Sequence, residues 1–335
     1  MKAIVLREVG GPENLRYEEV DTPKPKAGEV LVKLKYAALN RRDVFISFGM
    51  YPGMKLPSIL GADGAGVVAA IGDDVQNIEI GSEVIIDSGI GWGEDERKSN
   101  PGFYILGMPV DGTYAQYVVV PAENIYGKPK HLTWEETAAL PLAGVTGYRA
   151  LVTRGQVQEG ETVLIPGIGS GVALFVLQMA VAKGAKVYVT SSSDEKIERA
   201  KQLGAVDGVN YQSPDWVKQL RKMMGAADLV VDGVGGPSFN QLLNLTAEGG
   251  RIVSYGATNG PIPEFVLPRI FLKNIDLRGT KMGSPRQFAE MLNFFEQHQI
   301  HPIIDRCYPL EHAAEAQAYM NQGKNFGKIT LEIPE

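Results

Sequence analysis

The stretch Val163-Leu164-Ile165-Pro166-Gly167-Ile168-Gly169-Ser170-Gly171 decides the fold of this chain. Its first three residues predict a buried strand, and the glycine-rich residues that follow predict a tight turn. An apolar helix is predicted over 172–183, and a second strand over 186–190 after Gly184. Together they form a βαβ unit of roughly thirty residues, the usual size of a mononucleotide-binding half. The turn glycines and the helix N-terminus therefore predict a phosphate site.

The same alternation continues beyond this unit. Helices are predicted over 194–203, 215–223 and 238–245, and strands over 209–211, 229–232 and 251–255. Strands that alternate with helices indicate a parallel sheet covered on both faces. Upstream, Thr133 and Glu136 form a capping-box pattern that begins a helix, and another helix is predicted over 146–153. We therefore predict a doubly wound α/β domain over 122–285.

The first part of the chain has a different pattern. Short runs rich in Val, Ile and Leu alternate with Gly, Pro and Asp turns, at residues 2–6, 29–38, 64–71, 83–87 and 114–120. This spacing predicts a small β-barrel or sandwich over 1–121. A helix over 285–298 and a strand over 328–333 suggest that residues 286–335 return to complete this domain. The charged, glycine-rich run from Ser88 to Gly112 is predicted to be a surface lobe or flexible loop.

Composition narrows the classes of function. The chain has 335 residues, 44% of them hydrophobic and 21% charged, as expected for a globular protein with two domains. A net charge of −6 and a pI near 5.4 argue against nucleic acid as a partner. The single cysteine, Cys307, excludes an intrachain disulfide framework and a cysteine-rich zinc site. No signal peptide or membrane span is recognisable, so we expect a cytoplasmic protein without a membrane partner.

Several stretches resemble the medium-chain dehydrogenase/reductase superfamily, on its zinc-independent quinone oxidoreductase-like side. The resemblance covers nearly the whole chain and is carried by Met1–Ile4, Ala38–Asp43, Leu60–Val68, Asp111–Tyr117, Gly144–Tyr148, Ser170–Ala173 with Gln178, Leu203–Ala205, Asp232–Gly236 and Gly327–Ile329. It implies a GroES-like β-barrel domain, a Rossmann domain and an active site in the cleft between them. It also implies a homodimer or a dimer-based tetramer, commonly joined through edge strands near 275–280.

The resemblance bears directly on a metal. Zinc-dependent members hold catalytic zinc with a Cys, a His and a second Cys or acidic residue. The first of these positions is Asn40 here, the stretch that contains the His reads Gly61-Ala62-Asp63, and the second Cys falls near Leu142-Ala143. Neutral amide and aliphatic side chains do not replace thiolate and imidazole as zinc donors. We therefore predict no zinc, and we interpret Glu94, Asp95 and Glu96 as a solvated loop.

The end of the second strand predicts which nicotinamide cofactor is used. NAD-binding units usually place an acidic residue there, which accepts hydrogen bonds from the ribose hydroxyls. Alignment on Leu203-Gly204-Ala205 puts Ser191 at this position, and Lys196 adds positive charge one turn into the next helix. This combination favours NADPH over NADH. We interpret Asp194 as the cap of that helix. Tyr211 matches a position beside the 2′-phosphate in quinone reductases, or it packs in the core at a strand end.

The resemblance assigns further cofactor contacts. The pyrophosphate turn is expected at Ser170, Gly171 and Val172, with Ala173 next. Tyr255, Gly256 and Ala257 follow a strand, where ligands sit in such sheets, and we expect them near the nicotinamide together with Thr146. Asn325 and Lys328 match a C-terminal loop that touches the cofactor. The alternative for Lys328 is a solvated lysine beside a strand.

Without zinc, hydride transfer suits an electron-poor acceptor that spreads negative charge through its own conjugation. Quinones and α,β-unsaturated carbonyl compounds are such acceptors, and the protein mainly orients them and donates to the developing oxyanion. The candidate residues are Asn40, Asp43 and Tyr51. Each candidate has an alternative to a role in catalysis: Asp43 could fix its loop through hydrogen bonds, and Tyr51 could pack on the barrel. Solvent could deliver the proton in place of a side chain.

Two other functions remain open. A 2-enoyl thioester reductase belongs to the same enzyme class, although no cluster of Lys or Arg is obvious near 40–51 to hold a phosphopantetheine arm. A non-catalytic NADPH-binding protein, of the lens-protein or RNA-binding type, comes from a different class. Turnover on quinones or enones separates the enzymes from that binding protein.

Overall fold

The predicted βαβ unit is present in the computed structural model, which describes residues 1–335. β11 (Thr162–Ile165) leads through the glycine turn into α4 (Gly171–Ala182), and β12 (Lys186–Ser191) pairs with β11 in parallel. Gly167 and Gly169 have φ angles of 65° and 123°. Residues with a Cβ are strained at such positive φ angles, so the turn requires glycine there.

Six parallel strands form the sheet of this part of the chain, in the order β13-β12-β11-β14-β15-β16. The four further strands are β13 (Asp207–Asn210), β14 (Ala227–Asp232), β15 (Thr246–Ser254) and β16 (Asp276–Gly279). The chain starts in the middle of the sheet, moves to one edge, and returns to the other side of β11. This is the order of a dinucleotide-binding fold, whose topological switch point lies between β11 and β14.

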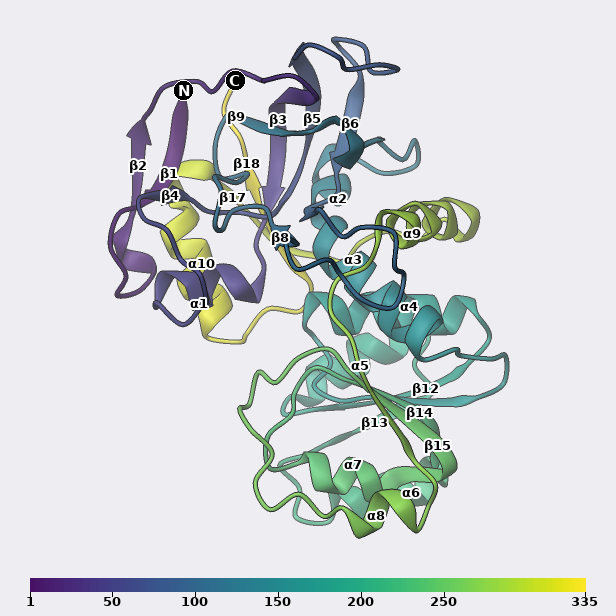
Figure 1. Ribbon diagram of the computed structural model, residues 1–335. Coiled ribbons are helices and arrows are strands. Elements are labelled where there is room, and N and C mark those ends of the chain that lie inside the picture. The colour runs from purple at the N-terminus through teal and green to yellow at the C-terminus, as the bar shows by residue number, and fades with distance from the viewer. The chain divides into compact units, whose positions relative to one another are not determined.

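Helices cover this sheet on both faces, as predicted. The remaining ones are α5 (Asp194–Gln202), α6 (Trp216–Met224), α7 (Phe239–Leu245) and α8 (Pro268–Phe271). α6, α7 and α8 lie together on one face (Figure 1), where Leu220, Phe239 and Leu243 pack with Leu164 and Ile252 of the strands. α4 is apolar around most of its circumference because it is buried on several sides.

The β-rich part forms a separate seven-stranded sheet with the order β10-β6-β5-β3-β18-β17, and β9 also pairs with β3. These strands are β3 (Glu29–Ala38), β5 (Asp63–Ile71), β6 (Glu83–Ile86), β9 (Tyr117–Pro121), β10 (Ile125–Gly127), β17 (Ile304–Pro309) and β18 (Lys328–Glu332). A three-stranded sheet combines β1 (Lys2–Leu6), β2 (Leu15–Glu19) and β4 (Ser58–Ile59). The predicted return of the C-terminal segment is confirmed, because β18 pairs with β3.

Four α-helices accompany these strands. They are α1 (Arg41–Ser47), α2 (Trp134–Ala139), α9 (Pro285–His298) and α10 (Ala313–Asn321). The predicted capping box is confirmed: Thr133 Oγ1 accepts from the Glu136 amide, and Glu136 Oε2 accepts from the Thr133 amide. Ser284 and Gln287 form a second capping box at the start of α9. These reciprocal bonds satisfy helix N–H groups that have no partner within the helix.

The chain divides into two compact units, Met1–Ala143 with Gly283–Glu335 (unit 1) and Gly144–Met282 (unit 2). Residues 122–143, which we expected in the nucleotide-binding domain, belong to unit 1 because β10 pairs with β6 and α2 contacts β3 and β5. α3 (Pro141–Tyr148) spans the division and continues as a π-helix over Arg149–Arg154. The predicted helix over 146–153 is therefore only its second half.

The lobe from Ser88 to Gly112 is more ordered than the sequence indicates. It contains the short strands β7 (Gly89–Ile90) and β8 (Tyr104–Ile105), which pair with each other. Trp92 is only 2% exposed, and its ring packs edge-on against Phe103 at a centroid distance of 5.2 Å. A flexible loop is therefore the wrong interpretation, because an aromatic pair organises it. None of the helices is both long enough and apolar enough to cross a membrane.

Candidate active site

Lys328 lies at the centre of a buried polar cluster in unit 1. It is the first residue of β18 and is 3% exposed. Its Nζ donates to the carbonyl oxygen of Leu39 at 2.8 Å, to Asn40 Oδ1 at 2.9 Å and to Asp63 Oδ2 at 3.0 Å. An ammonium group has three N–H donors, so all of them are used within the protein. The solvated lysine considered above is therefore wrong.

The Asp63 carboxylate holds this cluster together from the start of β5. Its Oδ2 accepts from Asn40 Nδ2 at 2.9 Å as well as from Lys328, and its Oδ1 accepts from the Leu142 amide at 2.8 Å. The side chains of Lys328 and Asp63 are 4% and 0% exposed, so this is a buried ion pair. Buried charges persist when they are paired and hydrogen-bonded, as both are here.

Asp43 lies in the first turn of α1 and is completely buried. Its Oδ2 accepts from the Asn40 amide and from the Tyr114 hydroxyl, both at 2.8 Å. Burial raises the pKa of Asp43, and burial together with the Asp43 charge raises the pKa of Tyr114 well above its usual value. Neither group is open to a substrate. These contacts favour the interpretation that Asp43 fixes the loop before α1.

Tyr51 is different because it is only partly buried and its hydroxyl has spare bonding capacity. The Arg42 guanidinium lies over its ring, with 4.8 Å between the guanidinium carbon and the ring centroid, and Arg42 Nε donates to the Tyr51 hydroxyl at 3.4 Å. Arg42 also donates to the carbonyl oxygens of Leu106 and Met108. The arginine thus fixes the tyrosine ring, and the tyrosine keeps its own O–H to donate.

In unit 2, several predicted cofactor residues meet at the carboxyl ends of the parallel strands. Ser170, which is exposed, caps α4, and its Oγ accepts from the Ala173 amide at 3.3 Å. Gly171 and Val172 are the first two residues of α4. The Ile168 amide donates to the Thr190 carbonyl oxygen, which joins the glycine turn to the end of β12. The capped helix N-terminus, at the switch point of the sheet, fits a pyrophosphate.

Tyr255, Gly256 and Ala257 follow β15 at the same edge. The Tyr255 amide donates to the Asp232 carbonyl oxygen, and a Cβ added at Gly233 would lie 2.4 Å from the Tyr255 ring. Gly233 therefore leaves room for the ring. Asp232 is buried, and its carboxylate accepts from the amides of Val234 and Gly235 at 3.0 and 3.1 Å. Burial raises the pKa of Asp232, and burial and the Asp232 charge raise that of Tyr255.

Ser191 ends β12 and is 3% exposed, and its Oγ accepts from the Ser193 amide at 3.2 Å. Ser193 caps α5, and its side chain accepts from the Lys196 amide. The cap therefore lies one residue before Asp194, where we predicted it. Asp194 instead accepts from Asn210 Nδ2. Tyr211 donates its amide to the Ser191 carbonyl oxygen and is 46% exposed, which rules out the core alternative for its ring.

Three further residues that the resemblance assigned to the cofactor are Thr146, Asn325 and Lys328. Thr146 lies in α3, and its hydroxyl points to Met282 Sδ at 3.9 Å. Asn325 belongs to unit 1, where its Nδ2 donates to the Gly327 carbonyl oxygen at 2.9 Å. Lys328 belongs to unit 1 as well, and donates there to Asn40 Oδ1.

Comparisons with known proteins give the family. The model of the alcohol dehydrogenase GroES-like domain matches residues 26–130, and that of the zinc-binding dehydrogenase matches 171–297. A zinc-type alcohol dehydrogenase-like protein of Schizosaccharomyces pombe is 36% identical over an alignment of 344 positions, which covers 99% of each chain. The chain belongs to the zinc-type alcohol dehydrogenase family. It is thus an NAD(P)-dependent oxidoreductase of the medium-chain dehydrogenase/reductase superfamily.

Two solved structures place this zinc-type alcohol dehydrogenase family member more closely. An NAD-dependent alcohol dehydrogenase is 40% identical, with a TM-score of 0.95 and complete coverage of both chains. A quinone oxidoreductase of Pseudomonas syringae pv. Tomato DC3000 is 30% identical, with a TM-score of 0.85 and 99% coverage of each. The expected superfamily and fold are confirmed. The expected quinone oxidoreductase-like branch is not, because the more similar proteins are alcohol dehydrogenases.

The family's zinc does not fit the residues of this member. The resemblance puts the three donor positions at the Asn40 amide, the Ala62 methyl group and the apolar pair Leu142-Ala143. The Asn40 oxygen already accepts from the Lys328 ammonium, and Asp63 is neutralised by that same cation. Nowhere in the chain do three or more His, Cys, Asp or Glu side chains gather in a way that could hold a metal ion. A lysine provides the positive charge at this place instead.

Sequence reasoning missed three residues of the cluster. Asp63 and Tyr114 were noted only as parts of family stretches, and Arg42 was given no role. A signal existed for Asp63, since an acidic residue that opens an apolar strand in Ala62-Asp63-Gly64 needs a buried partner. No comparable signal pairs it with Lys328, which lies 265 residues later in the chain.

Proposed function

We propose that this enzyme reduces quinones or α,β-unsaturated carbonyl compounds with NADPH and without a metal ion. The observation that carries the proposal is the buried Lys328–Asn40–Asp63 set, which includes the residue that the resemblance aligns with a zinc-binding cysteine, Asn40. Its donors and acceptors are already bonded to one another. The cluster therefore stabilises the fold. Because its polar atoms are already bonded to one another, it offers no site at which a substrate alkoxide could be coordinated.

The loss of the metal changes which reactions are accessible. In zinc enzymes the metal polarises the substrate oxygen and lowers the pKa of a bound hydroxyl. A conjugated acceptor needs less help, because its own π system spreads the negative charge that develops. A bound nicotinamide supplies the hydride. The protein must then orient the acceptor and donate a hydrogen bond to its oxygen.

Tyr51 is the residue best suited to donate that hydrogen bond. Asn40 and Asp43 are buried at 6% and 0% exposure, and their side chains are bonded within the cluster. Tyr51 is partly exposed, and its ring is held against Arg42. The adjacent guanidinium also favours a negative charge that forms near the hydroxyl. We therefore assign the donor role to Tyr51, with Arg42 as its positioning residue.

The end of β12 supports NADPH as the cofactor. Ser191 places a small neutral side chain where an acidic residue would repel a 2′-phosphate. Lys196 lies in the first turn of α5, and the exposed Tyr211 follows β13 beside Ser191. These three residues frame a place that accepts a phosphate and offers no carboxylate to the ribose hydroxyls.

A second candidate is NAD-dependent oxidation of alcohols, which the names of the relatives favour. Alcohol oxidation requires that the pKa of the substrate hydroxyl is lowered. Because this chain lacks ligands for zinc, another group would have to do so. Purified enzyme should be assayed with NADPH on a panel of quinones and enones, and with NAD⁺ and NADP⁺ on primary and secondary alcohols. Turnover confined to the first panel supports the proposal. Turnover confined to the alcohols overturns it, and tight NADPH binding with no turnover indicates a non-catalytic protein.

We also propose a homodimer joined through β16. This strand is the last in the sheet order, so one edge has no partner in the chain. Large apolar side chains are exposed around it: Leu267 at 58%, Phe271 at 60%, Leu272 at 70% and Leu277 at 46%. A second copy would pair the open edge and cover these side chains. Light scattering should give twice the chain mass, and the monomer mass for Leu272→Glu; a monomeric parent protein refutes the dimer.

A further inference from the structure

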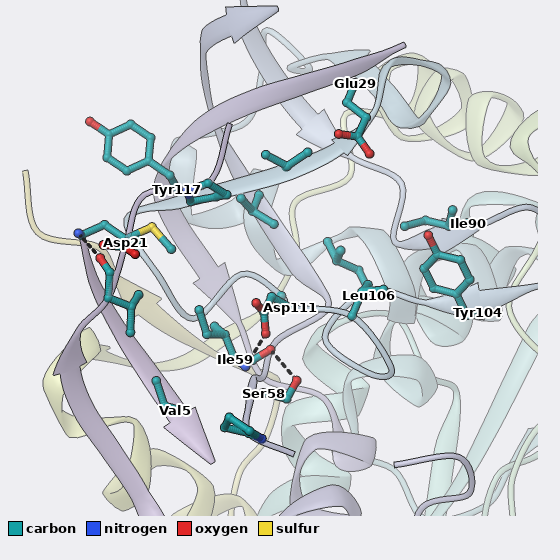
Figure 2. A pocket seen from close by; sticks show the side chains of 18 of the residues that line it. Val5, Asp21, Glu29, Ser58, Ile59, Ile90, Tyr104, Leu106, Asp111 and Tyr117 are labelled. Atoms are coloured by element: carbon teal, nitrogen blue, oxygen red, sulfur yellow. Dashed lines mark hydrogen bonds between the residues drawn. The ribbon is translucent and has the colours of Figure 1, made fainter. Parts of the chain in front are cut away.

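Unit 1 contains a cavity that the proposed reaction does not use. It encloses about 420 Å³, within the range of small-molecule sites. Its lining comes from β1, β3, β4, β7, β8 and β9 and from the loops that contain Asp21 and Asp111 (Figure 2). None of Asn40, Tyr51, Asp63 or Lys328 contributes to it. The cavity is therefore separate from the candidate active site.

The floor of the cavity is apolar. Side chains that are almost completely buried form it, namely Val5, Ile59, Ile90, Leu106 and Val118. They come from four different strands and the loop after β8, so the surface is supported by the core of unit 1. Such a floor suits the hydrocarbon part of a ligand.

The rim is acidic. Asp21, Glu29 and Asp111 contribute carboxylates, and Tyr104 and Tyr117 contribute aromatic rings. The Glu29 carboxylate and the Tyr104 hydroxyl point toward each other (Figure 2). Burial, together with the charge of Glu29, raises the pKa of Tyr104. One oxygen of Glu29 accepts from the Lys26 amide and one of Asp111 from the Ile59 amide, at 2.9 Å each. The other oxygen of each carboxylate remains to accept from a ligand.

The cations near the rim offset these acids only in part. The Arg7 guanidinium is paired with Glu18 at 2.6 Å, and the Met1 amino group donates to the Val20 carbonyl oxygen, also at 2.6 Å. The carbonyl oxygen of Val20 is neutral, so the Met1 ammonium keeps its charge and faces the three carboxylates of the lining. The pocket therefore combines an apolar floor with a net negative charge and two aromatic rings. An anionic ligand would be repelled.

We propose that this pocket binds a small amphipathic organic cation, a primary ammonium carried on an aryl or alkyl group. Its apolar part lies on the floor around Ile59 and Leu106. Its ammonium donates to the free oxygen of Glu29 and lies near the Tyr104 ring, since ammonium groups are attracted to carboxylates and to aromatic faces. The site is independent of the proposed reaction, and its test does not use turnover.

The test is a calorimetric titration of the full-length protein with phenethylammonium chloride and, separately, with 2-phenylethanol. The two probes differ mainly in the charged group. We expect saturable binding of the ammonium, at least tenfold weaker binding of the alcohol, and weakening of ammonium binding by added salt. Equal binding of both probes, or no saturable binding of the ammonium, overturns the proposal.

Variants locate the site. Glu29→Gln keeps an acceptor for the Lys26 amide but removes the charge, and we expect it to weaken phenethylammonium binding about tenfold. Glu83→Gln removes an exposed charge outside the pocket and should leave the affinity unchanged. Val110→Trp, at a rim residue that is 37% exposed, should block the pocket without disturbing the core. Unaltered affinity in Glu29→Gln and in Val110→Trp refutes the site.

Discussion

Lys328 Nζ lies 3.0 Å from Asp63 Oδ2, and the two side chains are 4% and 0% exposed. The contact joins the start of β18, close to the C-terminus, to the start of β5. Both residues also bond Asn40, so one ion pair fixes the loop before α1 and closes the β-rich unit. The same contact places a lysine beside Asn40, where the resemblance expects relatives to bind zinc.

Replacing the lysine alone should destabilise the protein strongly. Lys328→Met leaves the Asp63 carboxylate buried without its cation, and such a loss costs about 3–5 kcal/mol. Urea unfolding of the variant and the parent protein measures this difference. Lys324→Met, at an exposed lysine of the same segment, should change stability by less than about 0.5 kcal/mol.

The double variant separates the buried charge from the packing. Asp63→Asn with Lys328→Met removes both charges, and it should recover more than half of the stability lost in Lys328→Met. A single Lys328→Met variant as stable as the parent protein would show that the ion pair has no structural role.

Asp87 should make stability depend on pH. It is 1% exposed, and burial raises its pKa from 3.8 to about 7, although one oxygen accepts from the Gly89 amide. The folded state therefore holds its proton up to about pH 7, whereas the unfolded chain loses it near pH 4. Consequently this residue lowers stability progressively as pH rises from about 4 to about 7, and the full cost persists above that.

Asp87→Asn should accordingly be more stable than the parent protein at pH 8, by about 1–3 kcal/mol. The advantage should shrink as pH falls from 8 to 5, because the parent carboxyl becomes protonated. Thermal or urea unfolding at several pH values measures it, with Glu83→Gln as the exposed control. An advantage that is constant across this range would contradict a raised pKa at Asp87.

Ser191 should control the choice of cofactor. Ser191→Asp introduces a carboxylate that repels a 2′-phosphate and accepts from ribose hydroxyls, while it can still accept from the Ser193 amide. We expect NADPH affinity to fall at least roughly tenfold and NADH affinity to rise. Fluorescence titration measures both dissociation constants. Ser192→Asp, one residue further on, should produce no gain for NADH; a parent protein that already prefers NADH contradicts the assignment.

Tyr51 should affect turnover rather than cofactor binding. Tyr51→Phe keeps the ring against Arg42 but removes the hydroxyl, so kcat for enone reduction should fall about 10- to 100-fold. The dissociation constant for NADPH should stay the same. Tyr17→Phe, at a tyrosine that is 38% exposed, is the matched control. A kcat within about threefold of the parent value would mean that solvent delivers the proton.

The nucleotide-binding unit could be predicted almost completely from the sequence. Its strands are short apolar runs, and serine caps begin α4 and α5, so local pattern and fold agree from β11 to β15. The prediction was less accurate where tertiary contacts determine to which unit a segment belongs. Residues 122–143 join unit 1 through the pairing of β10 with β6, and no local pattern encodes a pairing between strands so far apart.

The candidate site shows the same division. Asn40 stands where the resemblance puts a zinc-binding cysteine, and this difference can be recognised from the sequence because it depends on one residue alone. The partner of that residue is not visible, because Lys328 and Asn40 lie 288 positions apart. The likeness to a cofactor-binding loop suggested another role for Lys328. Its burial beside an acid became clear only from the packing of β18 against β3.

Zinc content and activity, measured on the same protein, decide whether this oxidoreductase works without zinc. The protein should be purified without chelators, analysed for zinc by plasma mass spectrometry, and assayed for NADPH-dependent enone reduction before and after treatment with EDTA. We expect less than roughly 0.1 zinc ion per chain and unchanged turnover, because Asn40, Ala62 and Leu142 offer no zinc donors. One zinc ion per chain, with turnover lost on chelation, would contradict it.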